Sequence, residues 1–235
     1  MALPKITLPI FEAVLPSTKK KFKYRPMTLK EEKILLIAKE SNDPEHLVTA
    51  IKQVVNLCLA SKLNVETLAT FDIEYILVCI NSKSNNNVVE FKIRDDETKE
   101  LVEVEMNLDD LKIHFSDEHT DKIQVTDDCV IIMRYPSMNE VTRITRTFES
   151  NDINEIYKIF ISCMSKIVAG DDVFEPSSMS EEEISEFFEG LPSGSLKKMK
   201  TFFETMPVLR FEYKYTNNIG KEKTWVLQGL DNFFI

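Results

Sequence analysis

The side chains best suited to chemistry in this chain are its histidines and cysteines. His114 and His119 lie five residues apart beside the acidic stretch 116–121, SDEHTD, which offers oxygen and nitrogen ligands for a divalent cation. A calcium loop of the EF-hand kind needs oxygens at fixed alternate positions, a glycine at the bend and a distal glutamate. This stretch lacks that pattern, so we interpret it as a solvated acidic loop and predict no metal site.

A nucleophilic pair is the second possibility, because Cys129 follows His119 by only ten residues. Cys129, however, begins an apolar run typical of a strand, and a buried free thiol is the simpler interpretation. The chain contains no Gly-x-Ser-x-Gly elbow, no phosphate-binding loop and no dinucleotide-binding glycine pattern. We therefore predict that the protein is not an enzyme, with no catalytic residues and no cofactor.

Charge excludes two classes of partner. The formal net charge is −10, and the sequence pI is about 5.0, so nucleic-acid phosphates and anionic membranes would repel the chain. One basic cluster, residues 19–25 (KKKFKYR), runs against this trend. It is interpreted either as a solvated hairpin tip or as a surface that docks on an acidic partner.

Nothing in the sequence indicates secretion or membrane insertion. The N-terminus lacks the apolar core of a signal peptide, and no run reaches the roughly 18 apolar residues that span a bilayer. The four cysteines lie far apart, without a Cys-x-x-Cys pair, which favours reduced thiols. We expect folding in a reducing cytoplasm.

Two extended pieces open the chain. Pro4, Pro9 and Pro16 disfavour helix, and residues 10–14 and 21–24 alternate apolar with polar at the strand period. The sequence predicts an extended N-terminal arm and hairpin over 1–25, followed by a single α+β domain over 26–235.

That domain is expected to pack a helical layer against antiparallel sheet. The pattern predicts helices within 28–83, a β-meander over 86–135, helices within 152–206 and a C-terminal β-hairpin over 208–228. Capping boxes at Thr28 and Ser180, and Asp43 followed by Pro44, mark expected helix starts. A further helix is expected from about residue 64, and another over 152–168. No internal repeat stands out. The hairpin side chains Leu209, Phe211, Tyr213, Trp225 and Leu227 are expected to face the helices at 181–206.

The two ends of the chain are the candidate contact surfaces. The arm offers extended backbone with apolar side chains, and the C-terminus offers an apolar anchor that either packs on the chain's own helices or docks on a partner. The residues predicted to bind a partner are Ile10, Phe11, Phe22, Tyr24, Phe233, Phe234 and Ile235.

Several short strings, in this order, carry a resemblance: KYRP at 23–26, KEEKILL at 30–36, FDIEYI at 71–76, MRYP at 133–136, TMP at 205–207 and the FF ending. Together they resemble the baseplate hub proteins of T-even-like contractile-tailed bacteriophages. Residues 94–127 match least.

The resemblance implies a non-enzymatic structural or assembly role, with other hub proteins or the tape-measure protein as partners and neither nucleic acid nor membrane. It implies the host cytoplasm during assembly and the virion tail baseplate if the protein is retained. The alternative is a transient assembly chaperone that is absent from the mature virion. The oligomeric state stays open.

Overall fold

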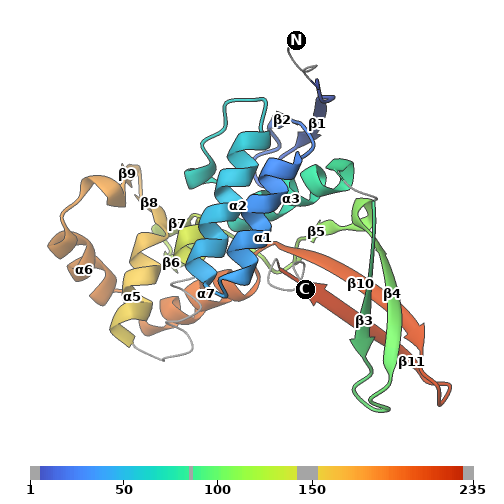
Figure 1. Cartoon of the computed structure of the whole chain (residues 1–235). Helices are drawn as coiled ribbons and strands as arrows, with labels where there is room; N and C mark the ends of the chain where they lie inside the picture. Colours follow the sequence, from blue (N-terminus) through green and yellow to red (C-terminus); the bar gives the residue numbers. More distant parts are fainter. Residues whose placement is uncertain (1–5, 85–86, 142–152, 230–235) are drawn as a thin grey trace, which may run out of the picture. The chain divides into compact units, whose positions relative to one another are not determined.

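A computed structural model describes residues 6–84, 87–141 and 153–229. It confirms the predicted α+β class, with helices and separate antiparallel sheets (Figure 1). The chain forms two compact units: unit 1 comprises Met1–His114 and Val208–Ile235, and unit 2 comprises Phe115–Pro207. This division differs from the arm and single domain that we expected, because the chain leaves unit 1, builds unit 2 and then returns.

The helices of unit 1 follow the predicted order. α1 spans Leu29–Glu40 and begins at the capping box of Thr28 and Glu31, and α2 spans Pro44–Cys58 with Asp43 as its N-cap. The helix expected from about residue 64 begins later, because Val65–Thr67 forms a 3-10 turn, η1, before α3 at Thr70–Ser84.

The predicted N-terminal hairpin is present. β1 (Phe11–Val14) pairs antiparallel with β2 (Lys21–Tyr24). Its turn is fixed to α3, because the Asp72 carboxylate accepts hydrogen bonds from the Ser17 backbone N–H, at 3.0 Å, and from the Ser17 hydroxyl. Asp72 belongs to the FDIEYI string, so this string has a structural role.

The expected meander over 86–135 is wrong as a single sheet. β3 (Val88–Arg94) and β4 (Leu101–Asn107) form one two-stranded sheet, and η2 (Leu108–Asp110) follows. β5 (Lys112–His114) instead pairs with β10 (Val208–Thr216), which pairs with β11 (Glu222–Gln228). Alternation predicts a strand but does not specify its partner, which here comes from the far end of the chain.

The C-terminal hairpin packs within unit 1. The indole of Trp225 lies 5.4 Å from the ring of Phe91 on β3, between ring centroids, and Leu209 and Leu227 are buried with Val78 of α3. The expectation that this hairpin faces the helices at 181–206 is therefore corrected: its apolar side chains contact α3 and the β3–β4 sheet.

Trp225→Ala should lower the free energy of unfolding by about 2–3 kcal/mol, somewhat less than for a fully buried tryptophan because the indole is only half-buried. Urea unfolding followed by circular dichroism measures this loss. Val226→Ala is the matched control, since Val226 is exposed on the same strand. Unchanged stability with loss of partner binding would instead assign Trp225 to an interface.

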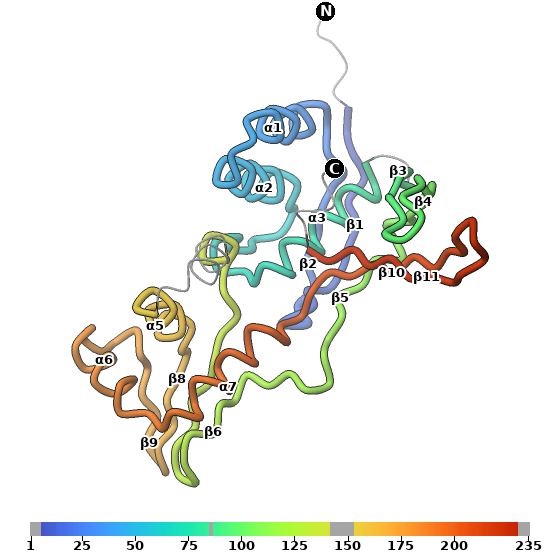
Figure 2. The backbone as a smooth tube through the Cα atoms, turned by 90° about the horizontal axis from the view of Figure 1, so that it is seen from below, coloured from blue at the N-terminus to red at the C-terminus, as the bar shows by residue number. Residues whose placement is uncertain are grey.

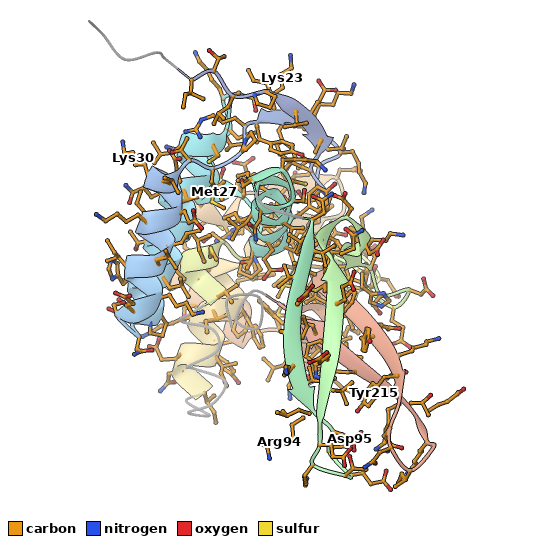
Figure 3. All side chains as sticks on the ribbon, turned by 45° about the vertical axis from the view of Figure 1, so that its right-hand side comes forward. Lys23, Met27, Lys30, Arg94, Asp95 and Tyr215 are labelled. Carbon is orange, nitrogen blue, oxygen red and sulfur yellow. The ribbon has the colours of Figure 1, made fainter. Side chains whose placement is uncertain are left out.

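The hairpins β3–β4 and β10–β11 are also joined near their tips, where Figure 3 labels Asp95 and Tyr215. The Tyr215 hydroxyl donates to Asp95 Oδ2 at 2.7 Å, and Lys223 Nζ lies 2.8 Å from Asp96 Oδ1. Lys221 reaches Glu97 at 3.0 Å. These bonds hold β3–β4 and β10–β11 together beyond the apolar core.

Unit 2 contains a four-stranded sheet in the order β6-β7-β8-β9, where β6 is Lys122–Thr126 and β7 is Cys129–Met133. The helix expected over 152–168 is shorter, because α5 spans only Ile153–Ser162. Met164–Ala169 instead forms strand β8, which pairs with β7. The apolar residues of this segment fit both the helical and the strand period. The segment forms a strand because it can pair with the edge of β7.

The remaining elements of unit 2 complete the core. β9 (Asp172–Phe174) is followed by the 3-10 turn η3 (Pro176–Ser178), then α6 (Glu181–Glu189) and α7 (Ser193–Glu204). α6 begins at a capping box of Ser180 and Glu183, as predicted. Ile131, Phe160, Phe188 and Phe202 bring the sheet and the three helices into one buried cluster.

The ring of His119 packs among hydroxyl groups and an aromatic ring of unit 2. Its ring nitrogens lie 3.0 Å from the Thr205 hydroxyl and 2.9 Å from the Tyr135 hydroxyl, and its ring centroid is 5.2 Å from that of Phe202. Burial lowers the pKa of His119 below its usual value of 6.5, although Asp121 opposes this effect. The side chain is therefore neutral at pH 7, and its contacts stabilise the core of unit 2.

The melting temperature of unit 2 should fall as the pH drops below about 6.5, the unfolded pKa of histidine. With a lowered folded pKa, the contribution of neutral His119 is fully present above the unfolded value and is lost as pH falls towards the folded one. Thermal unfolding at several pH values measures the slope. His119→Gln should flatten it, and His114→Gln, at an exposed site, should not.

Candidate interaction surface

The N-terminal segment presents apolar side chains to solvent. Ile6 is 88% exposed, Ile10 is 62% exposed and Val14, on β1, is 42% exposed. Since the side chains of an extended chain alternate, residues at even spacing share one face. The segment thus carries a line of exposed branched apolar groups.

The predicted contact residues fall into three groups. Ile10 is exposed, and Phe11 is half-buried with its ring centroid 5.8 Å from that of Tyr24. Phe22 and Tyr24 are buried in unit 1, so they support the hairpin from within. Phe233, Phe234 and Ile235 lie outside the described residues.

The outer edge of β1 is open. The Leu15 N–H donates to the Lys20 carbonyl. Because hydrogen-bonded and non-hydrogen-bonded residue pairs alternate along an antiparallel hairpin, Ala13 is hydrogen-bonded to Phe22. The backbone groups of Glu12 and Val14 therefore point away from β2. Within the described part of the chain, no strand pairs with that edge. It is available for addition of a strand.

The opposite edge of the hairpin is covered. The Ala60 N–H donates to the Lys23 carbonyl at 2.8 Å, and the Lys23 N–H donates to the Ser61 hydroxyl at 3.1 Å. Tyr24 also forms a bridge with Leu59. Among the described residues, the edge of β2 is therefore covered at Lys23 and Tyr24, whereas no strand pairs with the outer edge of β1.

An arginine at the end of β2 joins the hairpin to both neighbouring helices. Arg25 Nη2 lies 2.9 Å from Glu31 Oε1 of α1 and 3.1 Å from the Leu57 carbonyl of α2. The Arg25 N–H donates to the Cys58 carbonyl at 2.9 Å. We call this set the first arginine clamp; it explains why Tyr-Arg-Pro precedes the first helix.

The clamp keeps Glu31 ionised although its side chain is buried. Burial alone would raise the pKa of Glu31, but hydrogen bonds from Arg25 and Thr28 outweigh it and lower the pKa to about 2. The burial of Cys58 beside the clamp raises its pKa to about 11, so this thiol is protonated at neutral pH.

Unit 2 contains a second arginine clamp with the same connectivity. After β7, Arg134 Nη2 lies 2.7 Å from Glu140 Oε1 and 2.7 Å from the Ser162 carbonyl at the end of α5. The Arg134 N–H donates to the Cys163 carbonyl at 2.8 Å. Ser137 takes the place of Thr28, since its N–H and hydroxyl both donate to Glu140.

The two clamps reveal an internal structural repeat, so our expectation of none is corrected. In each unit a hairpin ends at an arginine, a capping serine or threonine follows three residues later and the paired glutamate six residues later. The arginine N–H donates to the carbonyl of a cysteine at the end of a later helix, Cys58 of α2 in unit 1 and Cys163 directly after α5 in unit 2. The sequence signal was Arg-x-x-Ser/Thr-x-x-Glu directly after a strand, which occurs at Arg25 and Arg134.

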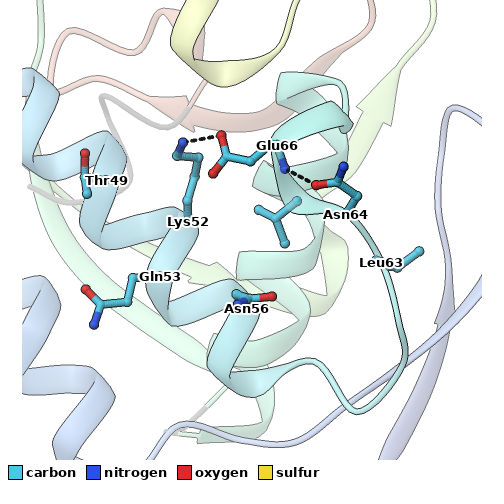
Figure 4. Close-up of a pocket in the computed structure, with 8 residues that line it drawn as sticks. Thr49, Lys52, Gln53, Asn56, Leu63, Asn64 and Glu66 are labelled. Carbon is cyan, nitrogen blue, oxygen red and sulfur yellow. Dashed lines mark hydrogen bonds and ion pairs between the residues drawn. The ribbon is translucent and has the colours of Figure 1, made fainter.

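A groove lies beside α2 in unit 1 and beside α5 and α6 in unit 2. In unit 1 it has a volume of about 330 Å³, and Lys52 in its lining pairs with Glu66 at 2.6 Å (Figure 4). In unit 2 the groove measures about 920 Å³ and includes Ile161, Met164 and Met179. Both grooves are lined by polar and apolar side chains together.

Comparison with known families decides the biological setting. Residues 8–235 match the family described as T4 bacteriophage base plate protein. The chain belongs to this family. Neither the curated proteins nor the solved structures include a match to it.

The family match supports a structural role in a phage tail baseplate. The part of the chain that the structure describes contains no group of three or more residues able to hold a metal ion. None of its described helices is long and apolar enough to cross a membrane.

Proposed function

We propose that this baseplate protein is a non-enzymatic component of the baseplate hub and acts by associating with other hub or tape-measure proteins. The observation that carries this proposal is the open edge of β1, which is continuous with the exposed apolar segment from Ile6 to Ile10. Main-chain hydrogen bonds from an added strand supply affinity, and the alternate side chains supply specificity.

The runner-up is a transient chaperone that shields a hub or tape-measure protein during assembly in the host cytoplasm. Both roles use the same surface, so retention in the virion distinguishes them. Quantitative mass spectrometry of purified virions should recover the protein in fixed stoichiometry with other hub proteins. Its absence from virions, together with presence in infected lysates, would replace the subunit by the chaperone.

Val14→Pro should prevent baseplate assembly while leaving the hairpin folded. The Val14 N–H points away from β2, so proline removes only the donor that an added strand would use. The measurement is complementation of a phage lacking this gene, beside circular dichroism of the purified variant. Infectious particles in normal yield from the folded variant would exclude strand addition at this edge.

Ala13→Pro is the matched control, since the Ala13 N–H bonds to β2 and its loss should destabilise the hairpin itself. Deletion of residues 1–10 tests the segment before β1, and deletion of 233–235 tests the C-terminal end. Each should give a folded protein that fails to complement. If both truncated proteins fold and support infection, the ends are not the working surface.

A further inference from the structure

Charge is segregated between two segments of this chain. Residues 13–30 contain six basic residues and no acidic one, whereas residues 167–196 contain eight acidic residues and no basic one. The first segment holds the end of β1, all of β2 and the start of α1, while Glu12 on β1 lies just outside it; the second holds β9, η3 and α6. Such blocks in a chain of mixed charge favour association between oppositely charged surfaces.

The acidic surface of unit 2 is defined by the eight carboxylates of residues 171–189, on β9, on α6 and in the loops that flank β9. All eight are exposed, and none forms an ion pair in the described parts of the protein. They are Asp171, Asp172, Glu175, Glu181, Glu182, Glu183, Glu186 and Glu189. Unpaired like charges repel one another, and a cationic partner relieves that repulsion.

Apolar groups accompany these carboxylates. Val173 is 57% exposed and Phe174 is 40% exposed on β9, the outermost strand of its sheet. β9 leads through η3 into α6 (Figure 2), and the groove of unit 2 lies against this segment with Met179 in its lining. The surface thus combines negative charge, apolar contact area and an open strand edge.

The hairpin β1–β2 has the complementary character. Lys20 and Lys23 are exposed, as is Lys30 at the start of α1, and Figure 3 labels Lys23 and Lys30. Val14 provides exposed apolar area on the paired strand. Lys21 is partly neutralised by Glu12, at 3.0 Å.

We propose that the hairpin β1–β2 of one molecule docks on the acidic surface of unit 2 in a second copy of the chain. Charge complementarity selects the partner, and contact of Val14 with Val173 and Phe174 adds apolar burial that exposed ion pairs alone lack. The contact joins two different surfaces, so it repeats head to tail and gives either a closed ring or a filament. This inference does not depend on the proposed function.

Sedimentation equilibrium of the full chain tests the contact. The wild type should associate at about 50 mM salt and dissociate at about 500 mM, where the Debye length falls from roughly 14 Å to roughly 4 Å. The double variant Lys20→Glu/Lys23→Glu should associate at least about tenfold more weakly, and so should Glu175→Lys/Glu186→Lys. None of these four side chains forms a hydrogen bond in the described structure, so each variant should fold.

Mixing the two charge-reversal variants is the decisive experiment. In the mixture, the wild-type hairpin of the Glu175→Lys/Glu186→Lys variant meets the wild-type acidic surface of the Lys20→Glu/Lys23→Glu variant. The equimolar mixture should therefore recover a one-to-one complex, although neither variant associates alone. Phe174→Ser should weaken association without a change of charge. Lys112→Glu/Lys214→Glu, at exposed sites on β5 and β10, carries the same charge change as the hairpin variant and should behave as wild type.

Three results would overturn the inference. One is a monomeric wild type at low salt. Another is a mixture that stays dissociated although each variant alone has lost association. The third is an equal loss in the Lys112→Glu/Lys214→Glu control, which would attribute the effect to net charge. Each of them is measured by sedimentation of the purified protein, whereas the proposed function is tested by complementation and by mass spectrometry of virions, so the inference and the proposed function can fail separately.

Discussion

Arg25→Ala lowers the free energy of unfolding of unit 1 by about 3 kcal/mol. The substitution leaves the buried Glu31 carboxylate without its cation, and removing one partner of a buried ion pair costs about 3–5 kcal/mol. The lower end of this range applies, because the Thr28 N–H still donates to the Glu31 carboxylate. Arg25→Lys should recover little, since an ammonium cannot reach Glu31, Pro26 and Leu57 together as the planar guanidinium does.

Urea unfolding followed by tryptophan fluorescence measures this loss, because Trp225 is the sole tryptophan and lies in unit 1. Arg134→Ala is the matched control: its clamp in unit 2 is more exposed, so its effect on circular dichroism should be smaller. The double variant Arg25→Ala/Glu31→Ala should be less destabilised than the sum of the single variants. Simple additivity would mean that the two side chains act independently.

The stabilising effect of Glu31 depends on pH. Its folded pKa of about 2 lies below the unfolded value, so the contribution is fully present above about pH 4.5 and is lost as pH falls towards 2. The Arg25→Ala variant should therefore differ most from the wild type near neutral pH.

Phe202→Ala has the second large effect, a loss of about 3–5 kcal/mol from unit 2. The Phe202 side chain is 1% exposed, and its ring centroid lies 5.2 Å from that of His119 and 5.7 Å from that of Tyr135. Truncation leaves a cavity at the centre of the cluster that joins α7 to the sheet.

Thermal unfolding followed by circular dichroism measures this change. Phe203→Ala is the control, because the neighbouring ring is only half-buried and should cost clearly less. If the Phe202 and Phe203 variants lose equal stability, the cluster is not centred on Phe202.

Much of the local structure followed from the sequence. The capping boxes at Thr28 and Ser180, the proline at the start of α2 and the alternation of β1 and β2 act over a few residues, so a linear reading identifies them. The charge of the hairpin and the apolar character of the arm were equally visible. Of the candidate contact residues, Ile10 is exposed while Phe22 and Tyr24 are buried, a distinction that alternation alone leaves open because it does not say which face is covered.

Only the tertiary structure decided which strands pair. β5 joins β10 although the whole of unit 2 lies between them in sequence, and β8 replaces the end of a predicted helix because the edge of β7 accepts it. The internal repeat was hidden for the same reason, since its two clamps are defined by contacts with Leu57 and Ser162, far from each arginine in sequence. Local propensity selects helices, turns and strands, whereas pairing and burial depend on long-range contacts that compete for the same hydrogen bonds and apolar surface.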